Sequence, residues 1–140
     1  MLNDLDTLYA LIRRFEGCRL MSYLCPAGVW TCGWGSTGPD VFPGRAWTQE
    51  YADQRLEHDA LKFARGTHAA CPLLTGDRLS AISDFAYNLG LGALRGSTLR
   101  RRVNDERWEE AAAELRKWVN GGGRKLPGLV LRREAEVALL

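Results

Sequence analysis

The stretch from Glu16 to Thr37 constrains the fold of this chain more than any other part of its sequence. Ahead of it, apolar residues at helical spacing predict an amphipathic helix over residues 4–16, which Gly17 then ends. The apolar positions of this helix are Leu5, Leu8, Ile12 and Phe15.

A β-hairpin is predicted directly after this helix. Two short runs rich in β-branched and aromatic residues, 19–24 and 29–34, have the composition of strands. Between them, Pro26 and Gly28 occupy the second and fourth positions of a turn that begins at Cys25, which is the chemistry of a type I turn.

The hairpin would bring three polar groups together, namely the carboxyl of Glu16, the thiol of Cys25 and the hydroxyl of Thr31. A carboxylic acid beside a partner that holds water is the minimal equipment for breaking a glycosidic bond. Glu16 would end a helix, where the dipole disfavours an anion, and Phe15 and Leu20 make its sequence neighbourhood apolar. Both features favour the protonated carboxyl that a general acid requires.

The rest of the chain predicts a long helix and then several shorter ones. Thr48 caps a helix that runs to about residue 64, and Gly66 ends it. After Pro72 the pattern is helical throughout, with helices expected over residues 79–89, 97–103, 108–119 and 127–140.

Length and composition indicate one globular domain, because the 140 residues are 46% hydrophobic and 26% charged. We expect a mostly helical α+β architecture. A small β-hairpin lobe, about residues 1–65, would be joined by the long helix to a helical lobe, about residues 66–140. No run of about 18 apolar residues predicts a transmembrane helix, and the first residues lack the basic character of a signal peptide.

Charge is distributed unevenly along the chain. From Arg95 onward, eleven basic and seven acidic residues give a net charge of +4, against +2 for the whole chain. This half of the chain suits an anionic partner such as a cell-wall polymer, although solvated helix faces have the same composition.

Three other motifs lack the context that their chemistry needs. The glycines of residues 33–38 match G-x-G-x-x-G, but Pro39 and a loop follow where a dinucleotide site needs a helix. The arginine run 100–102 belongs to no recognisable nucleic-acid reader, so no nucleic acid is expected. The four cysteines form no C-x-x-C pair and lie beside only one histidine, His68, so we expect no metal, no other cofactor and no cysteine-hydrolase site.

At these residues the chain resembles the phage-type lysozymes, the muramidases of glycoside hydrolase family 24. The resemblance covers nearly the whole chain, and its motifs are specific together because they occur in the family's order. The strongest matches lie in residues 15–17, 23–35, 85–90, 97–99 and 122–136. The resemblance implies a lysozyme-like fold with the lobes described above.

The family pattern is a glutamate, a second residue nine positions on and a threonine six further on, which here are Glu16, Cys25 and Thr31. Cysteine replaces the usual aspartate at the second position, a change that the family is understood to tolerate. The resemblance further implies that Arg132 pairs with Glu16. It also implies that five residues contact the glycan, namely Thr37, Tyr87, Asn88, Thr98 and Glu114.

The function that the resemblance implies is an endolysin that hydrolyses the β-1,4 bond between N-acetylmuramic acid and N-acetylglucosamine in peptidoglycan, which lyses the host cell. We expect a monomer without stable membrane insertion, made in the host cytoplasm and acting on the wall after release by a holin. Two alternatives stay open. One is a lytic transglycosylase, which forms a 1,6-anhydro sugar without adding water. The other is a non-catalytic wall-binding module, suggested by the missing aspartate and the basic C-terminal half.

Overall fold

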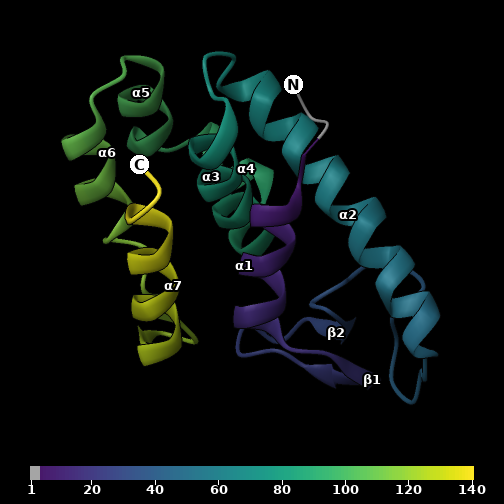
Figure 1. The fold of residues 1–140 in the computed structure, drawn as a ribbon. Coiled ribbons are helices and arrows are strands. Elements are labelled where there is room, and N and C mark those ends of the chain that lie inside the picture. The colour runs from purple at the N-terminus through teal and green to yellow at the C-terminus, as the bar shows by residue number, and fades with distance from the viewer. Residues whose placement is uncertain (1–3) are drawn as a thin grey trace.

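The computed structural model describes residues 4–140, which form seven helices and two small antiparallel sheets (Figure 1). The first three residues of the expected N-terminal lobe lie outside the described residues. The elements are α1 (Asp6–Glu16), β1 (Arg19–Leu24), β2 (Trp30–Gly33), α2 (Gln49–Ala70), α3 (Gly76–Leu89), α4 (Leu91–Arg95), α5 (Thr98–Asn104), α6 (Trp108–Leu115), β3 (Asn120–Gly121), β4 (Arg124–Lys125) and α7 (Pro127–Val137). This content confirms the mostly helical α+β class.

Helix α1 places Glu16 at the junction of a helix and a strand. Its inward face buries Leu8, Leu11 and Ile12, so packing against α2 and α3 fixes the helix. Gly17 ends it at φ +65°, a left-handed conformation that glycine adopts without strain, and its N–H donates to the Arg13 carbonyl at 3.2 Å.

The predicted hairpin is confirmed, with β1 spanning the expected residues. Strands β1 and β2 pair antiparallel, with Tyr23 opposite Thr31 and a bulge between Arg19 and Tyr23. The turn closes where the N–H of Gly28 donates to the carbonyl of Cys25 at 2.8 Å. The hairpin therefore holds Cys25 at its tip and Thr31 on its second strand.

The long helix α2 extends further than its sequence predicted, because it continues past Gly66 to Ala70. A side chain at Gly66 would have its Cβ 2.5 Å from Cδ1 of Leu91, the first residue of α4. Gly66 is therefore required for the close approach of two helices and does not stop α2. At 22 residues, α2 is about 33 Å long, and it runs from the hairpin region to the helical lobe (Figure 1).

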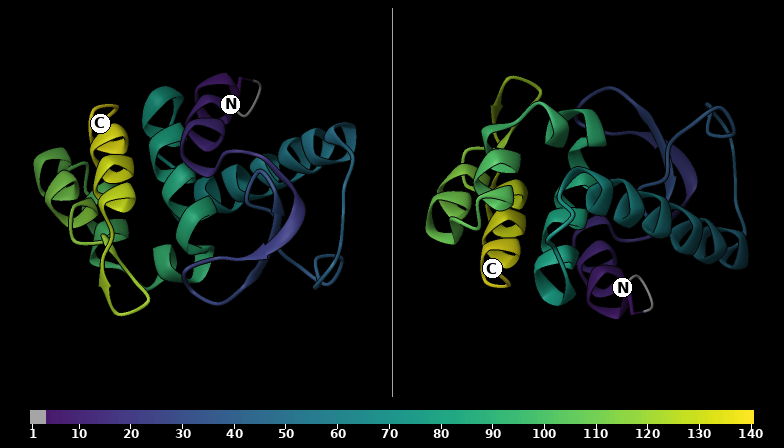
Figure 2. Two further views of the ribbon diagram at one scale, coloured as in Figure 1. Left: turned by 90° about the horizontal axis from the view of Figure 1, so that it is seen from below. Right: turned by 90° about the horizontal axis from the view of Figure 1, so that it is seen from above.

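The helical lobe surrounds an apolar core that includes Phe85, Leu94, Leu99 and Leu115. Helices α5, α6 and α7 lie to one side of α3, and the hairpin region lies to the other (Figure 2). The lobe differs from the prediction in that α4 lies where no helix was expected and α6 and α7 end at Leu115 and Val137, short of residues 119 and 140. The glycine-rich segment after α6 also forms the β3–β4 hairpin. The sequence did not predict the β3–β4 hairpin, because a two-residue strand leaves no periodic pattern.

Thr48→Ala is expected to lower the free energy of unfolding by about 1 kcal/mol. The reason is that the Thr48 side chain accepts a hydrogen bond from the N–H of Tyr51 at 3.1 Å, which satisfies one free donor at the start of α2. Thr75 precedes α3 in the same way but makes no such side-chain bond, so Thr75→Ala is the matched control, expected to change stability by less than about 0.5 kcal/mol. Urea denaturation measures both, and equal losses would contradict this assignment of the cap.

Candidate active site

Glu16, the last residue of α1, contacts a buried ion pair formed by two other helices. Nη1 of Arg132 on α7 donates to Oε2 of Glu16 at 2.7 Å, and the side chains are 4% and 17% exposed, respectively. The same guanidinium donates to both carboxylate oxygens of Asp84 on α3, from Nε at 2.9 Å and from Nη2 at 2.8 Å. The structure thus places Arg132 against Glu16, as the resemblance implies. It also shows that Asp84 binds the same guanidinium.

The surroundings of Glu16 are more polar than its sequence neighbours suggested. The guanidinium groups of Arg14 and Arg132 lie over the Phe15 ring, at 4.6 and 5.7 Å from its centre, and Leu20 is 38% exposed. The expectation of an apolar environment around the carboxyl was therefore wrong. The guanidinium that contacts the Glu16 carboxyl also contacts the carboxylate of Asp84.

Gly35 forms one wall of the Glu16 site. It follows β2 at φ +88°, and a Cβ atom built on it would lie 2.6 Å from both Cδ and Oε1 of Glu16. Any side chain at this position would collide with the carboxyl. The backbone of the hairpin exit therefore lies directly against the acid.

Cys25 and Thr31 are both oriented by the main chain of Val29. The N–H of Val29 donates to Sγ of Cys25 at 3.4 Å, and the hydroxyl of Thr31 donates to the carbonyl of Val29 at 2.9 Å. Because the Thr31 proton is engaged in this way, its oxygen keeps lone pairs that can accept a hydrogen bond from water. Thr31 is buried and Cys25 is half-buried, and all four cysteines of the chain are free.

Tyr23 connects the acid with the hairpin side chains. It stands opposite Thr31, and burial together with the nearby Glu16 and Cys25 raises its pKa, although Arg19 opposes that effect. The Tyr23 hydroxyl is therefore within electrostatic range of both Glu16 and Cys25. Because they are cross-strand partners, Tyr23 and Thr31 lie on the same face of the hairpin.

The β3–β4 hairpin of the helical lobe reaches the tip of the β1–β2 hairpin. A Cβ atom on Gly122, which has φ +58°, would lie 3.3 Å from the carbonyl oxygen of Pro26. The two hairpin turns thus meet directly beside Cys25.

The five residues expected to contact glycan are placed differently from one another. Tyr87 is buried, and its hydroxyl donates to the carbonyl of Trp34 at 2.7 Å; burial raises its pKa, and Asp59 and Glu16 add to this effect. Asn88 is half-buried, and its Oδ1 accepts from Arg133 at 2.9 Å.

The other three are Thr37, Thr98 and Glu114. Thr37 is exposed, Thr98 is half-buried at the start of α5, and Glu114 is half-buried on α6, where Lys117 donates to it at 2.6 Å. Across residues 4–140, none of these three makes a hydrogen bond or ion pair with Glu16. The structure therefore leaves their joint role as a prediction.

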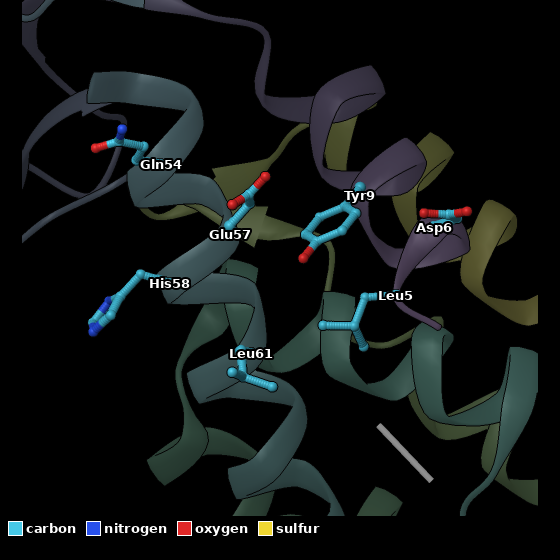
Figure 3. A pocket seen from close by; sticks show the side chains of 7 residues that line it. All are labelled: Leu5, Asp6, Tyr9, Gln54, Glu57, His58 and Leu61. Carbon is cyan, nitrogen blue, oxygen red and sulfur yellow. The ribbon is translucent and has the colours of Figure 1, made fainter. Parts of the chain in front are cut away.

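A separate depression lies between α1 and α2, away from these side chains (Figure 3). It has a volume of about 520 Å³ and is lined by Leu5, Asp6, Tyr9, Gln54, Glu57, His58 and Leu61. It contains none of the predicted site residues, and among the described residues the carboxyls of its acids, Asp6 and Glu57, make no hydrogen bond to the other residues that line it. The chemistry therefore favours the region around Glu16. No helix within residues 4–140 combines the length and the apolar character needed to cross a bilayer.

Comparison with known proteins identifies the family of the chain. The sequence profile of the phage lysozymes matches residues 13–136, which is most of the chain. The chain belongs to the phage lysozyme family. The endolysin of Acyrthosiphon pisum secondary endosymbiont phage 1 is 40% identical over 135 residues, which cover 92% of this chain and 91% of that protein.

Two further phage lysozyme comparisons bear on length and fold. The endolysin of Bacillus phage B103 is 38% identical over 132 residues, so the match covers 92% of this chain but only 50% of that relative. The muramidase domain of SpmX from Asticaccaulis excentricus superposes with a TM-score of 0.83 at 32% identity, covering 96% of this chain and 94% of that one. These matches confirm the expected lysozyme-like fold and, at the level of the family, the glycoside hydrolase class and the peptidoglycan substrate.

The sequence did not single out two residues of this phage lysozyme site. Asp84 is the one acid among the buried residues of α3, and its position between the apolar Ile82 and Phe85 is a sequence signal of a buried charge but not of its partner. Gly35 stands out in the sequence only as one of the glycines of residues 33–38, and the structure shows that it faces the carboxyl.

Gly35→Ala is expected to destabilise the protein more than Gly44→Ala. Both residues have a left-handed backbone, at φ +88° and +78°, so each substitution introduces similar strain of about 1 kcal/mol. Only the Gly35 methyl group meets Glu16, because nothing lies within 4 Å of a Cβ on Gly44. Urea denaturation of both variants tests this difference, and equal stabilities would show that Gly35 does not form a wall of the site.

Proposed function

We propose that this phage lysozyme is an endolysin that hydrolyses the β-1,4 bond between N-acetylmuramic acid and N-acetylglucosamine in peptidoglycan and so lyses the host cell. The observation that carries this proposal is the placement of the Glu16 carboxyl, anchored by Arg132 on one oxygen and bordered by Gly35 on the other. A carboxyl fixed in this way can protonate a leaving oxygen at a defined position.

Glu16 acts as the general acid. Arg132 holds Oε2, so Oε1 is the oxygen that can carry the proton toward the glycosidic oxygen. The absent side chain of Gly35 keeps the space beside Oε1 open. When the proton transfers, the bond from the anomeric carbon to the leaving oxygen breaks, and positive charge develops on the sugar ring.

Thr31 and Cys25 hold the attacking water on the opposite face of the sugar. Thr31 donates to Val29, so its oxygen accepts a hydrogen bond from the water and turns the water's lone pair toward the anomeric carbon. The Cys25 sulfur, oriented by the N–H of Val29, accepts a hydrogen bond from the water's other proton, and the proton that the water loses on attack is released to the solvent. Water attack opposite to the leaving group inverts the configuration of the anomeric carbon.

The glycan contacts complete the proposal. Thr37, Tyr87, Asn88, Thr98 and Glu114 position the polymer along the acid. Asn88 illustrates how: because Arg133 occupies its amide oxygen, its amide nitrogen is oriented and can donate to a sugar hydroxyl or acetamido group.

We further propose that residues 1–140 work as one domain and as a monomer, and that a holin gives the protein access to the wall.

Glu16→Gln is expected to abolish the release of reducing ends from purified peptidoglycan, a loss of at least about a hundredfold, because the amide cannot donate the required proton. Glu109→Gln is the matched control, since Glu109 is an exposed glutamate on α6, and it should keep the parental rate. Binding to the wall, measured by pelleting, should persist in both. A Glu16→Gln variant that keeps the parental rate would refute the acid role, and a parent protein that binds without releasing products would refute the enzymatic function.

The new reducing end is expected to appear first as the α-anomer, as direct attack by water requires. Proton NMR of early products from a defined glycan oligomer reports this configuration. Cys25→Ser should keep the α-anomer at a lower rate, because a hydroxyl still holds the water, while Cys18→Ser, at another half-buried cysteine, should keep the parental rate. A β-anomer, or a sugar adduct on Cys25 detected by mass spectrometry, would contradict the mechanism.

A further inference from the structure

A cluster of buried charged residues lies behind Glu16, and the proposed chemistry uses only its member Arg132. Asp84 is fully buried at 0% exposure, Arg132 is 4% exposed, and both Arg133 and Glu136 are at 0%. Nε of Arg133 lies 2.7 Å from Oε1 of Glu136. Two arginines and two acids from α3 and α7 thus form one buried cluster that Arg132 joins to Glu16.

Two carboxylates compete for the guanidinium of Arg132. Asp84 accepts two of its hydrogen bonds, and Glu16 accepts one, from Nη1. A two-point contact fixes the plane of a guanidinium, which a single contact does not. The direction in which Nη1 points at Glu16 is therefore set by Asp84.

Asp84 is the ionised partner within this cluster. Burial opposes its ionisation, but the hydrogen bonds and charge of Arg132 outweigh burial and hold the pKa of Asp84 below its ordinary value. Burial and the nearby Asp84 raise the pKa of Glu136 well above its ordinary value. Asp84 thus supplies the negative charge that offsets Arg132, and Glu136 is the acid that retains a proton.

We propose that Asp84 is a positioning residue for the reaction: it holds Arg132 through two hydrogen bonds and offsets its charge, so that Glu16 is anchored by the arginine and still keeps the proton it must donate. An arginine without a buried counter-charge would draw Glu16 into its ionised form. The inference rests on the proposed function, because it concerns the acid that this function requires.

Other titratable groups around Glu16 do not replace Asp84 in this role. The pKa values of Tyr23 on β1 and Tyr87 on α3 are raised mainly by burial, with Glu16 adding to the effect at Tyr23, and Asp59 and then Glu16 at Tyr87, so both are neutral hydroxyls near pH 7. On α7, Arg133 lies against Glu136, the acid that retains its proton, and among the described residues neither of them forms an ion pair with Glu16. Asp84 is the acid that contacts Arg132 together with Glu16.

The test compares the pH dependence of peptidoglycan hydrolysis between the parent and Asp84→Asn, which keeps the shape and removes the charge. The pH above which activity declines should fall by about one unit, so activity at pH 7 should drop about tenfold relative to activity at pH 5. Glu136→Gln is the matched control, because it alters a buried acid of the same cluster without touching Arg132, and its profile should follow the parent. In the double variant that combines Asp84→Asn with Glu136→Gln, the pH above which activity declines should fall at least as far as in Asp84→Asn. The reason is that Glu136 can then no longer ionise in place of Asp84.

A second double variant keeps the test decisive if Asp84→Asn alone does not fold. In Asp84→Asn combined with Arg132→Gln, two amides replace the buried ion pair, so no unbalanced charge remains beside Glu16. Its activity should then decline at a pH no lower than that of the parent. A decline at lower pH in this double variant would overturn the inference, as would an Asp84→Asn profile reduced equally at every pH.

Carbon-13 NMR of the Glu16 carboxyl separates the inference from the proposed function, because it needs no substrate. Glu16 should take up its proton at a lower pH in Asp84→Asn than in the parent. An identical titration in both proteins overturns the role of Asp84. A parent protein that releases no product overturns the proposed function, whatever the titration shows.

Discussion

The guanidinium of Arg132 is the contact on which the proposed site depends. It joins Glu16 on α1 to Asp84 on α3, partners that lie 116 and 48 residues away in the chain. Burying such a charge is costly unless it is paired. The charged side chains of Glu16, Asp84 and Arg132 can therefore be buried only where α1, α3 and α7 lie together. The acid thus belongs to the N-terminal segment but is fixed by the helical lobe.

A second set of constraints comes from the backbone of the hairpin. Val29 orients Cys25 through its N–H and Thr31 through its carbonyl, and Gly35 lies against the Glu16 carboxyl. The proposed proton donor is therefore placed by buried charges, and the groups proposed to hold water are placed by main-chain hydrogen bonds. This division explains how cysteine can replace aspartate at position 25, because the hairpin turn sets the position of this residue whichever chemical group its side chain has.

Local patterns allowed much of this structure to be predicted from sequence. The helix before Gly17 and the hairpin around Cys25 were foreseen because periodicity and turn chemistry act over a few residues. Gly66 was misread because a glycine that stops a helix and one that admits a neighbouring helix look alike in sequence. The role of Asp84 could not be predicted, since its partner Arg132 lies on a helix much later in the chain.

The measurement that tests the account most directly is mass spectrometry of the soluble products released from purified peptidoglycan. Hydrolysis with Glu16 as acid predicts muropeptides that end in a reducing N-acetylmuramic acid and carry the added mass of one water. Anhydro products would show that no water is delivered and that the chain is a transglycosylase. The absence of soluble products from a protein that pellets with the wall would show a binding module, and either result would contradict the account.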